Sequence, residues 1–146
     1  MSINTRARRK LQGNEAGFSL VELLVVLAII GMIATMVTPQ VLGYLGRAKG
    51  ETARIQVKNI AQAVELYYLD LGAYPSTQQG LQALVQPTGP AWRGPYVRDA
   101  RGLTDPWGHP YLYRSPGAGG APFDVYSLGA DGRAGGQGDH ADVASN

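Results

Sequence analysis

The longest apolar stretch of the chain runs from Phe18 to Thr38, and Glu22 is the only ionisable side chain among its 21 residues. At a rise of about 1.5 Å per residue, a helix of this length reaches roughly 30 Å, the thickness of a bilayer core. Residues 18–39 therefore predict a transmembrane helix. Because Pro39 has no backbone donor, we expect the helix to loosen or kink there.

A second pattern, with apolar positions three and four residues apart, covers about residues 50–71. It predicts an amphipathic helix that buries one face against a small domain, and Gly72 is suited to end this helix. Between the two patterns, three glycines are compatible with a flexible joint or with close packing of neighbouring helices. These glycines are Gly43, Gly46 and Gly50, and the apolar stripe consists of Ala53, Val57, Ile60, Ala61, Val64, Tyr67, Tyr68 and Leu71.

The middle of the chain, residues 72–128, alternates Pro- and Gly-rich loops with short apolar segments. A small antiparallel sheet packed against the amphipathic helix would give an α+β fold, within a domain that spans residues 40–146. The elements expected here are a short helix capped by Ser76 or Thr77 and ending near Val85, strands at residues 111–114 and 123–128, and a third short strand near Tyr96 and Val97.

The end of the chain, residues 129–146, is rich in Gly and Asp and has no apolar periodicity. Such a composition suits a disordered tail, and it also suits a loop held by a hard cation. Asp131, Asp139 and Asp142 supply carboxylate oxygens, and Ca²⁺ accepts about six to eight oxygen ligands. The spacing is not that of an EF-hand.

The carboxylate of Glu22 would be an unpaired charge in lipid, which costs roughly 2.5–3.5 kcal/mol on insertion scales. A cut after Gly17 would place a new α-amino group on Phe18, one helical turn from Glu22. A secretory signal peptide has its small-residue cleavage site after the apolar region, whereas Gly17 comes before it. The helix would therefore survive processing. An uncleaved membrane anchor is the alternative, and it leaves Glu22 unexplained.

The basic charge of the chain is concentrated in residues 1–17. This leader carries Arg6, Arg8, Arg9, Lys10 and Glu15, a net charge of +3, while the whole chain carries +2. The remainder is therefore at −1, so we expect no nucleic-acid-binding face. Lys and Arg beside an apolar helix tend to stay cytoplasmic, which places residues 40–146 in the periplasm of a bacterium with two membranes.

The sequence contains no recognisable combination of catalytic residues. It contains no nucleophile elbow, phosphate-binding loop or zinc-protease motif, and its two histidines, His109 and His140, are far apart. The chain has no cysteine, which excludes a disulfide framework and a thiolate metal site. We expect that the protein is not an enzyme.

The hexapeptide Gly17-Phe18-Ser19-Leu20-Val21-Glu22, with the basic leader before it and Pro39 beyond, resembles the processing site of type IV pilin-like proteins. The resemblance implies that a prepilin peptidase cuts between Gly17 and Phe18 and N-methylates Phe18. It also implies that Glu22 pairs with the amino terminus of a neighbouring subunit during assembly.

Three further motifs are Ser-Thr-Gln-Gln-Gly-Leu-Gln-Ala-Leu at 76–84, Asp-Pro-Trp-Gly at 105–108 and Ser-Leu-Gly-Ala-Asp-Gly at 127–132. They are similar to motifs of the major pseudopilins of type II secretion systems. The family's C-terminal loop binds Ca²⁺, which implies Asp131 as a side-chain ligand and Leu128 and Arg133 as backbone ligands. The second carboxylate stays open between Asp139 and Asp142, because the family ends in a pattern like Asp-Ile-Gly-Asn-Trp and this chain does not.

The resemblance implies a structural subunit that is stored in the inner membrane and polymerises into a periplasmic filament, which drives export of folded proteins across the outer membrane. The implied partners are further copies of the chain, minor pseudopilins, the prepilin peptidase, an inner-membrane assembly platform and a secretion ATPase. One alternative is a type IV pilin of a surface fibre, although such pilins commonly close their C-terminal region with a disulfide. The other is an anchored periplasmic binding module that never polymerises.

Overall fold

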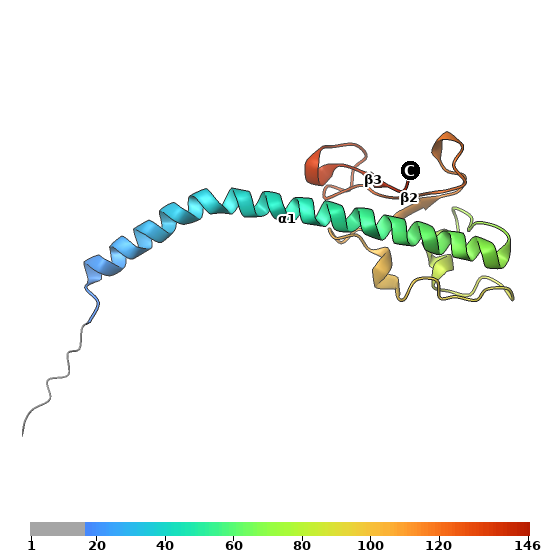
Figure 1. The fold of residues 1–146 in the computed structure, drawn as a ribbon, viewed down its shortest axis with the longest axis horizontal. Coiled ribbons are helices and arrows are strands. Elements are labelled where there is room, and N and C mark those ends of the chain that lie inside the picture. Colours follow the sequence, from blue (N-terminus) through green and yellow to red (C-terminus); the bar gives the residue numbers. More distant parts are fainter. Residues whose placement is uncertain (1–16) are drawn as a thin grey trace, which may run out of the picture. The chain divides into compact units, whose positions relative to one another are not determined.

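The computed structural model describes residues 17–146 (Figure 1). Within this range, one long α-helix is followed by four short 3₁₀ segments and three short strands. The chain divides into two compact units, with the boundary between Pro39 and Gln40, and each unit is described by itself. Apart from Gly17, the leader expected from the sequence lies outside the described residues.

The helix α1 covers Leu20–Leu71 and passes Pro39 without interruption. A helix can continue through a proline and still be kinked there, so the expected loosening or kink at Pro39 stays a prediction. The hydroxyl of Thr38, the residue before Pro39, donates to the carbonyl of Ala34 at 2.6 Å, which is a bond that threonines inside helices commonly make. The helix ends as expected: Gly72 has a left-handed φ of 73° and its N–H donates to Tyr68 at 2.7 Å.

The core of the second unit lies between the later part of α1 and the sheet (Figure 1). The expected amphipathic stripe is confirmed for most of its positions, which are buried, whereas Tyr68 is exposed. Loops and strands supply the opposite side of the core. The buried residues of the stripe are Ala53, Val57, Ile60, Val64 and Tyr67, and they pack with Ala63, Leu81, Ala83, Leu84, Leu103, Tyr111, Tyr113, Phe123, Val125 and Val143.

The sheet has three antiparallel strands in the order β1-β2-β3. They are β1 at Leu112–Arg114, β2 at Asp124–Ser127 and β3 at Val143–Ala144. In the register, Tyr113 lies opposite Val125 and Ser127 lies opposite Val143. The α+β architecture and the two strands expected from alternation are confirmed.

The third strand is not the expected one. The segment at Tyr96 and Val97 forms no strand, and the N–H of Tyr96 instead donates to the carbonyl of Leu84 at 2.8 Å. The third strand is β3, inside the Asp- and Gly-rich segment. Val143 is buried and its neighbour Ala144 is exposed, which is the alternation of a strand, but two residues are too few to recognise by pattern.

The short 3₁₀ segments connect the larger elements. The helix expected to follow Ser76 is the 3₁₀ segment η1. The turn that leads into η1 is closed by a reciprocal pair of bonds: Ser76 Oγ accepts from the N–H of Gln79 at 3.1 Å, and Gln79 Oε1 accepts from the N–H of Ser76 at 2.8 Å. The segments are η1 at Gly80–Leu84, η2 at Ala100–Leu103, η3 at Ala118–Gly120 and η4 at Gly138–His140.

Candidate functional site

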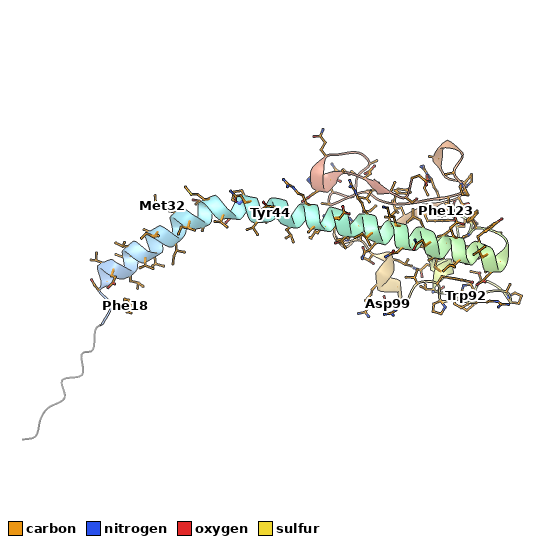
Figure 2. The ribbon with its side chains drawn as sticks, in the orientation of Figure 1. Phe18, Met32, Tyr44, Trp92, Asp99 and Phe123 are labelled. Atoms are coloured by element: carbon orange, nitrogen blue, oxygen red, sulfur yellow. The ribbon has the colours of Figure 1, made fainter. Side chains whose placement is uncertain are left out.

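The first unit presents its apolar side chains to the surroundings. Every described residue from 17 to 39 is exposed, and Phe18 is 85% exposed. Figure 2 shows Phe18 and Met32 projecting from the backbone. Within residues 17–146, α1 is the one helix that is long and apolar enough to cross a membrane.

The single carboxylate of this unit, Glu22, lies in the first turn of α1 and is exposed. The ion pairs found among residues 17–146 do not include it. A carboxylate near a helix N-terminus interacts favourably with the helix dipole, by typically 0.3–1 kcal/mol at exposed sites. If α1 crosses a membrane, this interaction would be too small to offset transfer of the charge into lipid, and Glu22 would need a cation from elsewhere.

A network around Asp105 joins the Asp-Pro-Trp-Gly turn to the start of the C-terminal loop. Asp105 is buried, and its Oδ1 accepts from the N–H groups of Trp107 at 3.0 Å and His109 at 2.8 Å. Its Oδ2 accepts from Ser127 Oγ at 2.6 Å, and the N–H of Gly129 donates to the same hydroxyl oxygen at 3.2 Å. The turn thereby fixes where the loop leaves β2.

The C-terminal loop, residues 129–142, is held by its own backbone and by glycines. The N–H of Ala130 donates to the carbonyl of Asp139 at 2.8 Å, which closes the loop at its base. Gly129 has a φ of 72° and packs against the backbone of residues 139–141, so a side chain there would be strained and would collide. The reading of this segment as a disordered tail is wrong.

The three expected carboxylates take different positions in this loop. Asp131 Oδ1 accepts from the N–H of Arg133 at 3.1 Å, and Asp131 Oδ2 lies 3.8 Å from His140 Nδ1. Asp142 Oδ2 accepts from the N–H of Gly135 at 3.0 Å. Asp139 instead directs its carboxylate against Gly46 of α1.

The donor set of the loop fits a hard cation only with help from the backbone. Within residues 17–146, no group of three or more His, Cys, Asp or Glu side chains is arranged to hold a metal ion. Two carboxylates, such as Asp131 and Asp142, would need carbonyl oxygens to complete a shell, and Ca²⁺ accepts such mixed oxygen ligands. Leu128 and Arg133, the expected backbone ligands, flank Asp131 in the chain.

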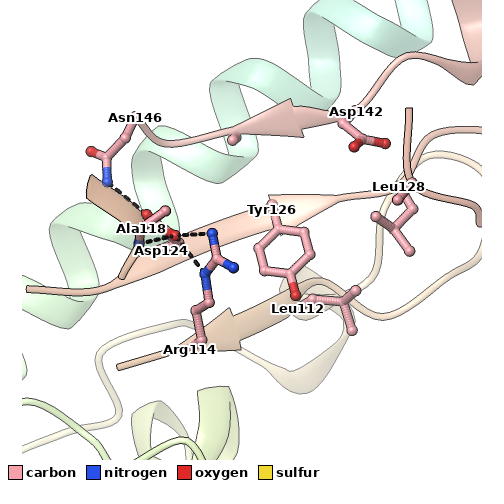
Figure 3. Close-up of a pocket in the computed structure, with 10 residues that line it drawn as sticks. Leu112, Arg114, Ala118, Asp124, Tyr126, Leu128, Asp142 and Asn146 are labelled. Atoms are coloured by element: carbon pink, nitrogen blue, oxygen red, sulfur yellow. Dashed lines mark hydrogen bonds and ion pairs between the residues drawn. The ribbon is translucent and has the colours of Figure 1, made fainter. Parts of the chain in front are cut away.

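A cavity of about 480 Å³ lies on the face of the sheet that does not pack on the core (Figure 3). At one end Arg114 donates through Nε to Asp124, and Asp124 also accepts from the N–H of Ala118 and the amide of Asn146. The Ala118 N–H contributes most to lowering the pKa of the Asp124 carboxyl, and Arg114 and Asn146 add to the effect. Asp142 and Leu128 line the same cavity.

A second cavity, of about 290 Å³, lies between α1 and the C-terminal loop. Its lining includes Arg47 and Arg54 from the helix and Trp107 from the turn. From the loop it includes Asp139 and Asp142.

The sequence did not reveal the Asp105 network or the contact of Asp139 with Gly46. Asp105 was visible only as a turn residue, because its distant partner Ser127 is 22 positions away. Gly46 was one of three similar glycines. The only sequence signal for the Asp105 network was the motif at residues 105–108, because the short side chain of an Asp can accept hydrogen bonds from nearby backbone N–H groups.

A long helix with an apolar, uncovered first part and a small antiparallel sheet packed on its second part defines a pilin-like protein. Residues 12–38 match the prokaryotic N-terminal methylation motif, and residues 40–146 match type II secretion system (T2SS) protein G. The chain belongs to the T2SS protein G family, the family of the major pseudopilins.

Known proteins support this assignment along nearly the whole chain. The type II secretion system core protein G of Pseudomonas aeruginosa is 47% identical over 135 residues, covering 90% of this chain and 94% of that protein. The core protein G of Vibrio cholerae is 41% identical over 141 residues, which cover 93% of this chain and 94% of that protein. The crystal structure of the major pseudopilin of enterohaemorrhagic Escherichia coli matches with a TM-score of 0.59 and 29% identity, covering 71% of this chain and 87% of that one.

Proposed function

We propose that the chain is cut between Gly17 and Phe18, that Phe18 is N-methylated, and that the mature protein polymerises into a periplasmic filament that pushes folded proteins across the outer membrane. The observation that carries this proposal is the uncovered apolar part of α1, in which Glu22 is the only charge. The match of residues 12–38 to a methylation motif supports the processing step. The members of the matched family are structural pseudopilins of a secretion system.

In this proposal the protein is stored in the inner membrane as a single-pass precursor, with residues 40–146 in the periplasm. A prepilin peptidase would process it, an assembly platform and a secretion ATPase would drive the addition of subunits, and minor pseudopilins would join the filament. Apolar side chains that lie in lipid before assembly can pack against other copies afterwards, which keeps them from water in both states.

Glu22 would neutralise the new amine of Phe18 on an adjacent subunit. Both charges enter a low-dielectric environment when the helices pack, and a buried charge without a partner is strongly unfavourable. The pair therefore gives each incoming subunit a defined position along its neighbour.

We further infer a Ca²⁺ site in the C-terminal loop. Asp131 would supply one carboxylate, Asp139 or Asp142 the second, and Leu128 and Arg133 the backbone oxygens. Asp139 and Asp142 both line the cavity between α1 and the C-terminal loop. Bound Ca²⁺ would neutralise the loop's acidic groups and tie its two ends together.

The proposed function is tested by deleting the gene in its host and restoring it on a plasmid, while exported proteins are followed in periplasm and medium. We expect exported proteins to accumulate in the periplasm of the deletion strain and to reach the medium after complementation. Mass spectrometry of the amino terminus of the purified protein should find methylated Phe18. An intact leader would favour the non-polymerising anchor. Methylated Phe18 with normal secretion and a lost surface fibre would favour a type IV pilin.

A further inference from the structure

The second unit begins with an apolar surface on α1 that the rest of residues 17–146 leaves uncovered. All four side chains of this surface are exposed, and Tyr44, which Figure 2 labels, is 69% exposed. The fold packs on another side of the helix, because the nearby Gly46 is buried. The surface consists of Val41, Leu42, Tyr44 and Leu45, and it continues the apolar run of residues 18–38 into the second unit.

The first cations after the apolar run come directly beyond this surface. Arg47 and Lys49 are the first basic residues after residue 18, and no Asp or Glu occurs between Glu22 and Glu51. At a membrane–water boundary, aromatic rings lie among the headgroups, and basic side chains reach the lipid phosphates. The order of an apolar run, a Tyr and then two cations therefore matches such a boundary, and its charge complements an anionic phospholipid.

The guanidinium of Arg47 lies over the ring of Tyr44, with 5.7 Å between Cζ and the ring centroid. Arg47 lines a cavity together with Glu51, Asp139 and Asp142, but it takes part in none of the ion pairs found among residues 17–146. The contact with Tyr44 turns the guanidinium toward the N-terminal side of Arg47, where the apolar surface lies. A guanidinium stacked on an aromatic ring keeps N–H donors for a phosphate group.

The length of this segment matches the headgroup layer of a bilayer. A helix rises about 1.5 Å per residue, so residues 40–45 cover roughly 9 Å along the helix axis. A bilayer is about 40–45 Å thick with its headgroups and its hydrocarbon core is about 30 Å thick, which leaves roughly 5–8 Å for each headgroup layer. If residues 18–39 span the hydrocarbon core, Tyr44 lies among the headgroups and Arg47 at their outer edge.

We propose that residues 41–49 are an interfacial anchor, which holds the start of the second unit in the headgroup layer of the outer leaflet of the inner membrane. Tyr44 lies at the level of the headgroups, and Arg47 binds the phosphate of an anionic phospholipid. This proposal rests on the storage of the chain in the membrane proposed above. Because the contact exists only while the subunit is stored, it opposes extraction of the subunit from the bilayer.

The first test measures contact with lipid headgroups in nanodiscs that hold one copy of the full-length chain. Because the chain has no cysteine, one introduced cysteine carries the only fluorescent label. Leu45→Cys is compared with Ile55→Cys, since both side chains lie on α1 and are 53% and 54% exposed. Lipids with a nitroxide on the headgroup should quench the label at residue 45 about threefold more than at residue 55, which lies roughly 15 Å further along the helix. Equal quenching at the two positions would overturn the proposal.

The second test measures the choice of lipid, by native mass spectrometry of the full-length chain in detergent with equal amounts of phosphatidylglycerol and phosphatidylcholine. Arg47→Gln removes the charge that contacts Tyr44. Arg54→Gln is the control, because Arg54 is exposed on the same helix and lies 3.9 Å from Glu51. We expect wild type and Arg54→Gln to retain phosphatidylglycerol preferentially, and Arg47→Gln to lower this preference about fivefold, as for one basic residue near an anionic surface. An unchanged preference in Arg47→Gln would contradict the role of this residue and refute the anchor.

The anchor and the storage of the chain in the membrane can fail separately. A label at Ile30→Cys, in the apolar run, reports insertion through its quenching by lipids with a nitroxide on the acyl chain. Quenching at residue 30 without headgroup quenching at residue 45 leaves insertion standing and refutes the anchor. No quenching at residue 30 contradicts membrane storage and the anchor together. A label at residue 45 that is shielded only in nanodiscs with several copies assigns the surface to a second copy and also refutes the anchor.

Discussion

Ser127 donates its hydroxyl to Oδ2 of Asp105 at 2.6 Å, and both residues are buried. The bond spans 22 positions in the chain and joins β2 to the turn that precedes β1. The same hydroxyl oxygen accepts the N–H of Gly129, so one side chain connects the sheet, the turn and the start of the C-terminal loop.

Replacing Ser127 by Ala is expected to lower the free energy of unfolding by about 1–3 kcal/mol, because it removes a donor from a buried carboxylate. The measurement is urea-induced unfolding of the full chain in detergent, followed by tryptophan fluorescence. Ser115→Ala is the control, because the Ser115 hydroxyl makes its hydrogen bond at an exposed site. Equal losses in the two variants would contradict the role given to the buried network.

Replacing Glu22 by Ala is expected to leave cleavage after Gly17 intact and to block filament assembly. The peptidase would still find its cleavage site, while the Phe18 amine would lose its counter-ion. Cleavage is followed by the shift in protein mass, and assembly by electron microscopy of sheared filaments. Glu51→Ala, at an exposed helical position in the second unit, serves as a comparison. Normal filaments in the Glu22 variant would remove the pairing mechanism.

The lowered pKa of the Asp124 carboxyl leads us to expect that the stability of the fold decreases at acid pH. Its pKa in the folded protein is lowered, first by the N–H of Ala118 and then by Arg114 and Asn146. A carboxyl whose folded pKa lies below its unfolded value of about 3.9 stabilises the fold above that value, and the contribution is lost as the pH falls through the folded pKa.

The acid dependence is measured as the difference in unfolding midpoint between wild type and Asp124→Asn. We expect a clear difference at about pH 7 that shrinks toward about pH 3. Asp99→Asn is the matched comparison, because the pKa of Asp99 is lowered mainly by the side chain of Arg101 at an exposed position. Such a surface pair should contribute little to stability. A difference for Asp124→Asn that is constant over this range would contradict the assignment.

Removal of Ca²⁺ is expected to lower the melting temperature of the protein. A ligand that binds only the folded state stabilises it by about 2.7 kcal/mol when present at 100 times its dissociation constant. Thermal unfolding is compared in calcium chloride and in excess EGTA, for wild type and for Asp131→Asn. We expect EGTA to lower the midpoint of wild type and to leave the variant unchanged. An unchanged wild-type midpoint would count against the calcium site.

Much of the fold could be predicted because short windows of the sequence contain the patterns that determine it. The apolar run, the stripe that includes Val57 and Val64, and the alternation in residues 123–128 each need only one window of sequence. Gly72 could be recognised as a helix end for the same reason. These features became α1 and β2 in the structure.

The rest depends on contacts between distant segments. The strand β3 is defined by pairing with β2, and its two residues carry almost no pattern of their own. The approach of Asp139 to Gly46 joins residues 93 positions apart, so neither residue predicts the other. The helix continues through Pro39, so the loosening or kink expected there stays a prediction. The predicted calcium ligands stay predictions, and they are Asp131, Asp139 or Asp142, and the backbone oxygens of Leu128 and Arg133.

The apolar first part of α1 has consequences for how subunits are supplied. A chain with these side chains uncovered has two favourable places for them, a lipid bilayer or other copies of itself, and water is neither. Growth of an assembly would then draw on molecules that diffuse in two dimensions. Its rate would follow the number of copies per unit area of membrane, so that enlarging the membrane at constant copy number would slow elongation.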